Sequence, residues 1–297
     1  MKNRWLLNLV MLAVVAGLVS FLYLRPKTNE NSASQFEVST LKLADFTSIK
    51  VEFPTKAPTS FEKIDGLWRM TAPYKMRADQ ASVQRILAII AAKSADKFSA
   101  TDLAKYALDN PQLRLKLTNA AGAHEFVFGT VNPVTEEQYV AFNDAVYLLP
   151  GSYIEAASTQ PIELIDKNPL TKEEAKQIAK FDFSRLEQWA EADLNVSLEN
   201  GQWKVNLPKA KITQNEMNEW LDFSWKQALA NSVELYTPDH NAKYPSFDVK
   251  LKNGKSVHFD KIQESPDLLL GRPDEGLMYH FNSDVGFNML NPPLNLQ

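Results

Sequence analysis

The sequence predicts an α+β protein in which one apolar N-terminal helix precedes two tandem copies of a unit made of a hairpin, a helix and a small meander. Three observations predict this class. Residues 5–24 form an uncharged apolar stretch, the rest alternates blocks of strand and helix periodicity, and one pattern recurs after 135 residues. Strands and helices in separate blocks favour an α+β arrangement over a parallel α/β sheet.

Length and composition fit two packed domains, and they argue against several kinds of partner. The chain has 297 residues, 44% of them apolar and 10% aromatic, enough for about two domains with cores. Four basic residues and no acidic residue fall in residues 1–27, so the remainder carries a net charge of −8. An acidic soluble part repels phosphate backbones, so we expect neither nucleic acid nor nucleotide as a partner.

The chain contains no cysteine. This excludes disulfides, thiolate nucleophiles and cysteine-ligated metal sites. It also fits an oxidising compartment, where a free thiol is a liability.

The first 24 residues predict a membrane anchor whose ends are Trp5 and Leu24. Twenty uncharged residues at 1.5 Å rise span about 30 Å, the thickness of a hydrocarbon core. Pro26 then stops the helix. A cleaved signal peptide is the alternative, but it requires small residues at the cleavage site, and this run ends in the bulky residues 21–24 (FLYL).

The orientation of the anchor follows from a nearly tied count of flanking charges. Lys2 and Arg4 precede the apolar run, and Arg25 and Lys27 follow it. We expect a single-pass protein of the bacterial inner membrane, with its N-terminus in the cytoplasm and its globular part in the periplasm. Residues 25–35 are polar and read as a flexible tether.

The first copy is expected over residues 36–157. Residues 48–53 alternate as a half-buried strand, and Asp65-Gly66 marks the turn of a hairpin within residues 60–71. Asp79 is a plausible N-cap for a helix whose apolar face has i, i+3, i+4 and i+7 spacing. A short helix at 101–108 and four further strands follow, at 112–117, 124–129, 138–142 and 146–149.

The second half repeats the first in three places. Residues 66–73 match 201–208 in the pattern G-x-W-[KR]-φ-x-x-P, residues 110–117 resemble 244–251, and residues 142–146 resemble 281–285. The offsets of 135, 134 and 139 keep the same order. A tandem duplication follows, with residues 158–170 as connector and 171–297 as the second, more diverged copy. A helical pattern again follows the signature, through Met217, Trp220, Leu221 and Ser224.

The repeated pattern gives a structural signature of six residues: Gly66, Trp68, Pro73, Gly201, Trp203 and Pro208. The glycine makes the hairpin turn, and the proline ends the strand. The indole can bury on the order of 150–250 Å² against the following helix. The alternative is a tryptophan that stacks on a carbohydrate or a peptide.

Residues 106–111 (YALDNP) precede an alternating strand and, together with the Trp–Pro element and the helix, resemble the bacterial domain-of-unknown-function family 4340. Members typically show Y-G-L-D-x-P, so Ala107 stands where glycine is usual, and the second copy keeps only the proline. The resemblance implies a membrane-tethered, extracytoplasmic protein. Some relatives are associated with gliding-motility or ABC-transporter components. No catalytic residues are described for the family, so none are carried over.

No stretch of the sequence carries a catalytic, cofactor or metal signature, and we expect no enzyme and no cofactor. The histidines at 124, 240, 258 and 280 lack metal-ligand spacing, and we interpret them as solvated or core residues. Asp239-His240 has no nucleophile elbow to complete a triad. S-x-x-K occurs at 39–42 and 94–97 without its companion motifs, and phosphate-binding glycine loops are absent.

Adjacent carboxylates at 136–137 and 173–174 point apart on a strand or helix, and we interpret them as a solvated face. The leading functional hypothesis is therefore a non-enzymatic accessory or scaffold protein of a cell-envelope assembly, tethered to the membrane and bound to a protein partner. A peptide-, glycan- or lipid-binding module is the first alternative, which a pocket lined by Trp220, Trp225 and Tyr236 between the copies would favour. An envelope hydrolase assembled from distant residues is the second.

Overall fold

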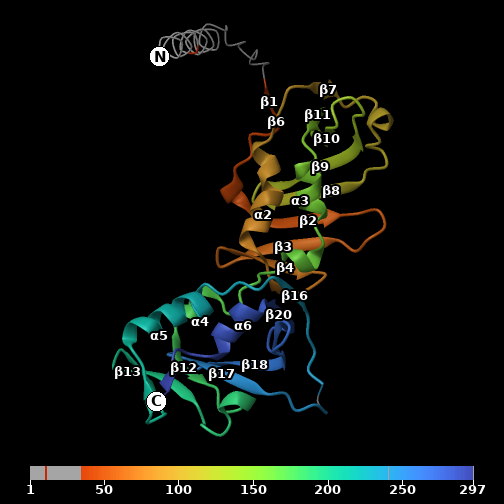
Figure 1. Ribbon diagram of the computed structural model, residues 1–297. Coiled ribbons are helices and arrows are strands. Elements are labelled where there is room, and N and C mark those ends of the chain that lie inside the picture. The colour runs from red at the N-terminus through yellow and green to blue at the C-terminus, as the bar shows by residue number, and fades with distance from the viewer. Residues whose placement is uncertain (1–10, 12–34, 240, 297) are drawn as a thin grey trace, which may run out of the picture.

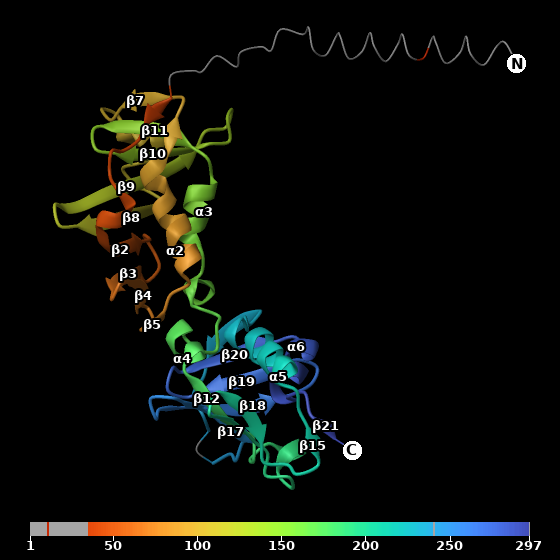
Figure 2. The same cartoon turned by 90° about the vertical axis from the view of Figure 1, so that its left-hand side faces the viewer.

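The computed structural model describes Met11 and residues 35–239 and 241–296. It is a mixed α+β protein, as predicted, with antiparallel strand pairing in its sheets and few helices. Figure 1 shows two lobes, each a sheet with helices packed against it, and Figure 2 shows the helices of the first lobe along one face of its sheet.

The first sheet has nine strands among the described residues, and hydrogen-bonded neighbours follow one another in this order: β5 (Met76–Arg77), β4 (Leu67–Ala72), β3 (Thr59–Ile64), β2 (Phe46–Glu52), β8 (Leu113–Asn119), β9 (Gly122–Val131), β10 (Gln138–Phe142), β11 (Ala145–Leu149) and β7 (Lys97–Ser99). Helices α2 (Gln80–Leu87) and α3 (Ser152–Ser158) cover one face of this sheet, and its other face is open. The predicted helix at 101–108 is only a 3-10 turn, Leu103–Tyr106.

The second sheet has eight strands in the described part of the chain, in this order: β14 (Gln202–Val205), β13 (Asn195–Glu199), β12 (Ile178–Asp182), β17 (Ser246–Leu251), β18 (Ser256–Gln263), β19 (Leu268–Arg272), β20 (Leu277–Phe281) and β16 (Ser232–Leu235). Its helices are α4 (Lys172–Lys176), α5 (Gln214–Leu221) and α6 (Ser283–Leu290), and a π-helical turn, Asp222–Lys226, extends α5. Two short pairs complete the fold: β1 (Phe36–Glu37) with β6 (Lys93–Ser94), and β15 (Ala210–Lys211) with β21 (Asn295–Leu296).

The two sheets have the same strand order when β4, β3 and β2 are set against β14, β13 and β12, and the following strands in turn. In each lobe the chain leaves an edge strand, β7 or β16, and crosses the open face of the sheet to reach β8 or β17. We call these crossing segments the straps, residues 100–112 and 236–245.

The third sequence match between the halves is wrong. Phe142 ends β10 and Asn143 makes the turn to β11, with a φ of 51°. Phe281 instead ends β20, and Asn282 is the N-cap of α6. Asparagine favours both left-handed turns and helix N-caps, so the same short string ends two non-equivalent strands.

Local sequence explains where the first lobe's hairpin and helix begin. Strands β3 and β4 pair as predicted around Asp65 and Gly66, both of which have a positive φ, as a two-residue hairpin turn requires. The Asp79 side chain accepts from the Ser82 backbone N–H at 2.7 Å, which confirms the predicted N-cap.

The predicted anchor, including its ends Trp5 and Leu24, lies outside the described residues except for Met11. Among the helices of the described residues, none has the length and hydrophobicity that a membrane crossing needs.

Candidate functional site

The two signature tryptophans occupy corresponding positions. Trp68 lies on β4 and Trp203 on β14, each the second strand of a hairpin, and their exposed fractions are 2% and 3%. Gly66 and Gly201 follow Asp65 and Asn200 in turns where all four residues have a positive φ. Both indoles therefore belong to the cores and offer no stacking face to a ligand.

A glutamine clamps the backbone of each tryptophan. The Gln80 side chain accepts from the Trp68 N–H at 2.9 Å and donates to the Trp68 carbonyl at 2.9 Å. Gln214 makes the same two bonds with Trp203, both at 2.8 Å. Each glutamine is the first residue of its helix, so it ties the hairpin to the helix that covers it. Sequence reasoning missed both, although a glutamine directly after an N-cap in each half was a usable signal.

The signature prolines lie in turns. Pro73 follows β4 and is preceded by a cis peptide bond, and Pro208 lies between β14 and β15. Each redirects the chain from the hairpin toward the helix, where the Pro ring cannot donate to a continuing ladder.

Arg77 joins the two lobes and is the centre of a largely buried polar cluster between them. It lies on β5, the edge of the first sheet, yet its guanidinium reaches Glu275 and Tyr279 of the second lobe. The Arg77 Nε and one terminal nitrogen contact the two Glu275 carboxylate oxygens at 2.9 and 3.0 Å. The guanidinium also binds Asp166 and donates to the Asn168 carbonyl at 2.7 Å.

A second arginine continues the cluster inside the second lobe. Arg272 ends β19 and is 2% exposed. It binds both Glu174 carboxylate oxygens, at 2.8 and 3.0 Å, and donates to the Pro169 carbonyl at 2.8 Å. It also contacts Asp274 at 3.0 Å. The interpretation of Glu174 as part of a solvated face is therefore wrong, because Glu174 pairs with the buried Arg272. Its neighbour Glu173 is exposed, as expected.

The charges of this joint stabilise one another. Burial by itself lowers the pKa of the Arg77 guanidinium, but hydrogen bonding to Glu275 holds that pKa above its ordinary value. Burial likewise raises the pKa of Glu174, and the Arg272 guanidinium more than reverses this, so the pKa lies below its usual range. Burial and the Glu275 carboxylate raise the pKa of Tyr279. Both arginines are thus fixed cations, and the joint is an ion-pair network rather than an acid–base site.

Little open space remains at the joint. A cavity of about 140 Å³ lies beside it, lined by Trp68, Arg77 and Gln80 of the first lobe, by Asp166 of the connector and by the start of α4. Such a volume is below the range of small-molecule sites. The contact between the lobes is filled by side chains that bind each other.

The tryptophans expected to line a pocket between the lobes instead cap a helix of the second lobe. The indole N–H groups of Trp220, Trp225 and Trp189 donate to the carbonyls of Asn288, Met289 and Leu290 at 2.7, 3.2 and 2.9 Å. These carbonyls end α6, where no intrahelical partner exists. Trp225 is 1% exposed and Trp220 7% exposed, so neither lines a pocket between the lobes.

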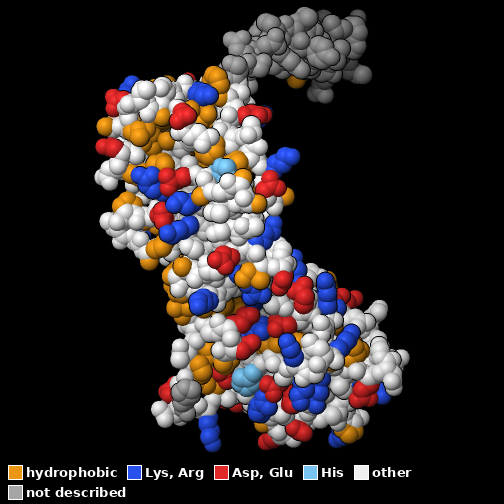
Figure 3. All heavy atoms as spheres, turned by 180° about the vertical axis from the view of Figure 1, so that it is seen from behind, with side chains coloured by type: hydrophobic (Ala, Val, Ile, Leu, Met, Phe, Trp, Pro, Cys, Tyr) orange, Lys and Arg blue, Asp and Glu red, His pale blue; other side chains and the backbone are white. Residues whose placement is uncertain are grey.

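The structure brings His258 together with two carboxylates, which the sequence did not indicate. On the open face of the second sheet, His258 Nδ1 lies 2.8 Å from Asp248 and Nε2 lies 3.2 Å from Asp260. Arg185 binds Asp248 at 2.8 Å, and the Tyr236 hydroxyl donates to Asp260 at 2.8 Å. Figure 3 shows acidic and basic side chains spread over the second lobe on the side opposite to that of Figure 1.

This row of side chains, Asp248, His258 and Asp260, is in contact with the strap. Tyr236 begins the strap, and its ring lies against Gly271, where a Cβ would meet ring carbons at 2.4 Å. Burial and Asp260 raise the pKa of the Tyr236 hydroxyl, so it stays a donor. Both imidazole nitrogens face carboxylates, and within the described residues no serine or threonine hydroxyl is hydrogen-bonded to His258.

The other histidines and the serine–lysine pairs are placed apart from this row. His124 lies on β9 and His280 on β20, with His280 Nε2 3.3 Å from Glu234, while His240 lies outside the described residues. The Ser39 hydroxyl donates to the Ile90 carbonyl at 2.7 Å, and Ser94 to the Leu148 carbonyl at 2.8 Å. Both hydroxyls thus serve the backbone. Over the described ranges, no cluster of three or more potential ligands could hold a metal ion.

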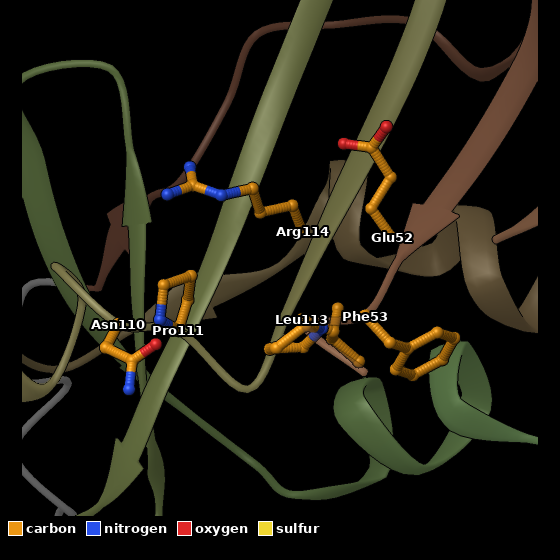
Figure 4. Close-up of a pocket in the computed structure, with 7 residues that line it drawn as sticks. Glu52, Phe53, Asn110, Pro111, Leu113 and Arg114 are labelled. Carbon is orange, nitrogen blue, oxygen red and sulfur yellow. The ribbon is translucent and has the colours of Figure 1, made fainter. Parts of the chain in front are cut away.

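A pocket of about 220 Å³ lies where β2 ends and β8 begins (Figure 4). Glu52 and Arg114 lie on one side of it, and Phe53, Pro111 and Leu113 lie on the other. Arg114 also binds Glu125 at 3.2 Å, and Lys50 binds Glu52 at 2.5 Å. Its charges are therefore paired across the sheet surface, and the pocket offers an apolar floor without a reactive group.

Comparison with known proteins gives a family and no function. No curated protein and no solved structure matches the chain. A family model described as "Domain of unknown function (DUF4340)" matches residues 68–271, from the first signature tryptophan to the glycine under the Tyr236 ring. The match covers more than half of the chain, so this protein belongs to the DUF4340 family.

Proposed function

We propose that this protein is a non-enzymatic scaffold of a cell-envelope assembly, held at the bacterial inner membrane by residues 1–24 and projecting two rigidly joined lobes into the periplasm. The observation that carries this proposal is the filled joint. The Arg77 guanidinium binds residues of the connector and of the second lobe. In this proposal, these bonds fix the angle between the lobes. A scaffold benefits from a fixed spacing, whereas a cleft that closes on a ligand requires a mobile one.

The same strand order in both sheets supports a second part of the proposal. We regard residues 36–157 and 171–297 as copies of one ancestral unit, with 25–35 as tether and 158–170 as connector. The two glutamine clamps support this, because the same side chain makes the same pair of backbone bonds in each lobe. A duplicated unit gives a scaffold two related surfaces on one chain.

The test is purification of the full chain from membranes in a gentle detergent, with protease protection of intact spheroplasts to assign the side of the globular part. We expect a stoichiometric membrane protein to co-purify, and the globular part to be digested from the periplasmic side. A wild-type chain that purifies alone from its native membrane, or a globular part protected by the inner membrane, would contradict the proposal.

The binding-module alternative is favoured by one observation, a groove with exposed aromatic residues on the second lobe. It differs from the expected site, because it lies on the helical face and not between the lobes. Binding there is compatible with scaffolding and defines a partner surface. The hydrolase alternative has no such support, since the His258 row is engaged with the strap.

A further inference from the structure

The helical face of the second lobe carries a groove lined by residues of α5, of the π-helical turn that follows it, and of α6 with the segment after it. Its volume is about 370 Å³. Trp220, Phe223 and Ser224 line one side, and Asn288, Asn291 and Pro293 line the other. The groove thus runs between two helices of the same layer.

Large apolar side chains stand exposed at this groove and beside it. Phe223 is 68% exposed, and Phe287, which shares a helix face with the lining Asn291 four residues later, is 62% exposed. Exposed aromatic residues grouped around a concave surface are typical of protein-binding sites. Two phenyl rings that are mostly exposed to water contribute little to the stability of the fold.

The π-helical turn is the reason that Phe223 points outward. The Gln227 N–H donates to the Asp222 carbonyl at 3.0 Å, five residues earlier. The wider turn lets Ser224 and Trp225 be buried while Phe223 stays exposed. Such turns occur frequently at functional sites.

The charges of the groove select among occupants. The charged residues that line it, Glu216 and Glu219, are both acidic, and neither forms an ion pair with another described residue. By contrast, the nearby Asp222 is paired with Lys226 at 2.6 Å. A partner that brings lysine or arginine to this rim is therefore attracted.

The same charges disfavour two other occupants. A second copy of the chain packed groove to groove would bring the two glutamates of each copy together, and like charges across an interface are unfavourable. A membrane surface with anionic lipids would be repelled as well. A helix fits a groove between helices and presents its apolar residues at i, i+3, i+4 and i+7.

We propose that this groove docks an amphipathic helix of a partner protein, with its apolar stripe on Phe223 and Phe287 and with lysine or arginine residues facing Glu216 and Glu219. The proposal rests on the scaffold function and names the chemistry of one partner. The preferred partner segment is apolar on one side and basic along its flanks.

The test uses the full chain in detergent micelles and two fluorescent 18-residue helical peptides with the same leucine stripe. One peptide has lysines on the flanks of the stripe, and the other has glutamates. We expect the lysine peptide to bind, measured by anisotropy, and the glutamate peptide to bind at least about tenfold more weakly. Equal binding of the two peptides, or no binding of the lysine peptide, overturns the proposal.

Variants locate the site. The double variant Phe223→Ser/Phe287→Ser is expected to weaken binding of the lysine peptide by about tenfold or more. Glu216→Lys with Glu219→Lys is expected to reverse the preference in favour of the glutamate peptide. Val134→Ser is the matched control, since Val134 is 87% exposed on the first lobe, and it should leave binding unchanged. Binding unaffected by both double variants overturns the proposal.

Two further readouts detect the rejected occupants. A wild-type dimer in sedimentation that the double serine variant loses would assign the groove to self-association. Flotation of the chain without residues 1–34 on vesicles of anionic phospholipid, lost in the same variant, would assign it to a lipid surface. Failure of the scaffold function is distinct, because it appears as a wild-type chain without a co-purifying partner, whereas failure of this inference leaves the partner bound to the serine variant.

Discussion

Replacement of Arg77 by methionine tests whether the ion-pair network holds the two lobes together. Methionine keeps much of the apolar stem and removes the guanidinium, with its bonds to Glu275, Asp166, Asn168 and Tyr279. The Glu275 side chain is 18% exposed and that of Asp166 22%, so both carboxylates would stay largely buried. Asp166 would lose its cation, and Glu275 would keep only Arg272, 3.5 Å away. Removing one partner of a buried pair costs about 3–5 kcal/mol.

The lower end of that range applies here. Glu275 keeps the Tyr279 hydroxyl as a donor at 2.6 Å, and Asp166 keeps the Asn168 backbone N–H at 3.0 Å. We therefore expect Arg77→Met to lower the free energy of unfolding by about 3 kcal/mol. Urea unfolding followed by tryptophan fluorescence measures this value. The joint variant Arg77→Met/Glu275→Met should recover most of the loss, because replacing both charges with apolar side chains is often neutral.

The distance between the lobes supplies an independent readout. The chain has no cysteine, so spin labels at Ala120→Cys and Asn253→Cys, which are exposed on different lobes, report on one pair of sites. We expect a narrow distance distribution in the otherwise wild-type chain and a broad one with Arg77→Met. A loss of stability below about 0.5 kcal/mol with an unchanged distribution would refute the view that Arg77 fixes the joint.

Four further changes test other parts of the structure. Ala107 has a φ of 54°, and Ala107→Gly should raise the free energy of unfolding by about 0.5–1 kcal/mol in urea titrations, as relief of a left-handed alanine predicts. Trp68→Ala should cost about 3–5 kcal/mol by the same measurement, since its indole is buried under α2. Gln214→Leu should cost about 1–3 kcal/mol by leaving the Trp203 N–H and carbonyl without their partner, and a neutral result would deny the clamp a role. For Glu174, the folded-state pKa lies below the ordinary 4.5, so its contribution to stability is complete above pH 4.5 and is lost as the pH falls through the folded value. Between pH 6 and pH 3, the free energy of unfolding should therefore fall less steeply with decreasing pH in Glu174→Gln than in the wild type.

Local signals predicted much of each lobe. Asp65-Gly66 specified a hairpin and Asp79 a helix start, because turn and cap preferences depend on neighbouring residues. Apolar alternation placed strands such as 138–142, which match the structure at both ends. The family resemblance is confirmed by the match over residues 68–271.

The joint could not be predicted in this way. Arg77 and Glu275 are 198 positions apart, and Arg272 and Glu174 are 98 apart. Nothing in a single sequence indicates which of its 32 basic and 36 acidic residues become buried partners. The groove was missed because it depends on a local change of helix type. A periodicity of 3.6 residues does not predict which way the residue 223 side chain points once the helix widens to a π-helical turn.

Each strap requires a glycine on the strand that it crosses, far from the strap in sequence. In the first lobe, Tyr106 and Leu108 of the strap lie so close to β9 that a Cβ on Gly129 would stand 2.1 Å from the Tyr106 carbonyl oxygen. The left-handed Ala107 between them allows this approach. In the second lobe the strap crosses Gly271 on β19 with the Tyr236 ring. Each strap thus needs one glycine beneath it, on whichever strand it crosses most closely. Gly129→Ala should therefore destabilise the first lobe more than Gly122→Ala, where a Cβ meets no atom within 4 Å, even though Gly122 has a positive φ and Gly129 does not. The opposite order in urea titrations would mean that backbone conformation, and not the crossing strap, sets the need for glycine at these positions.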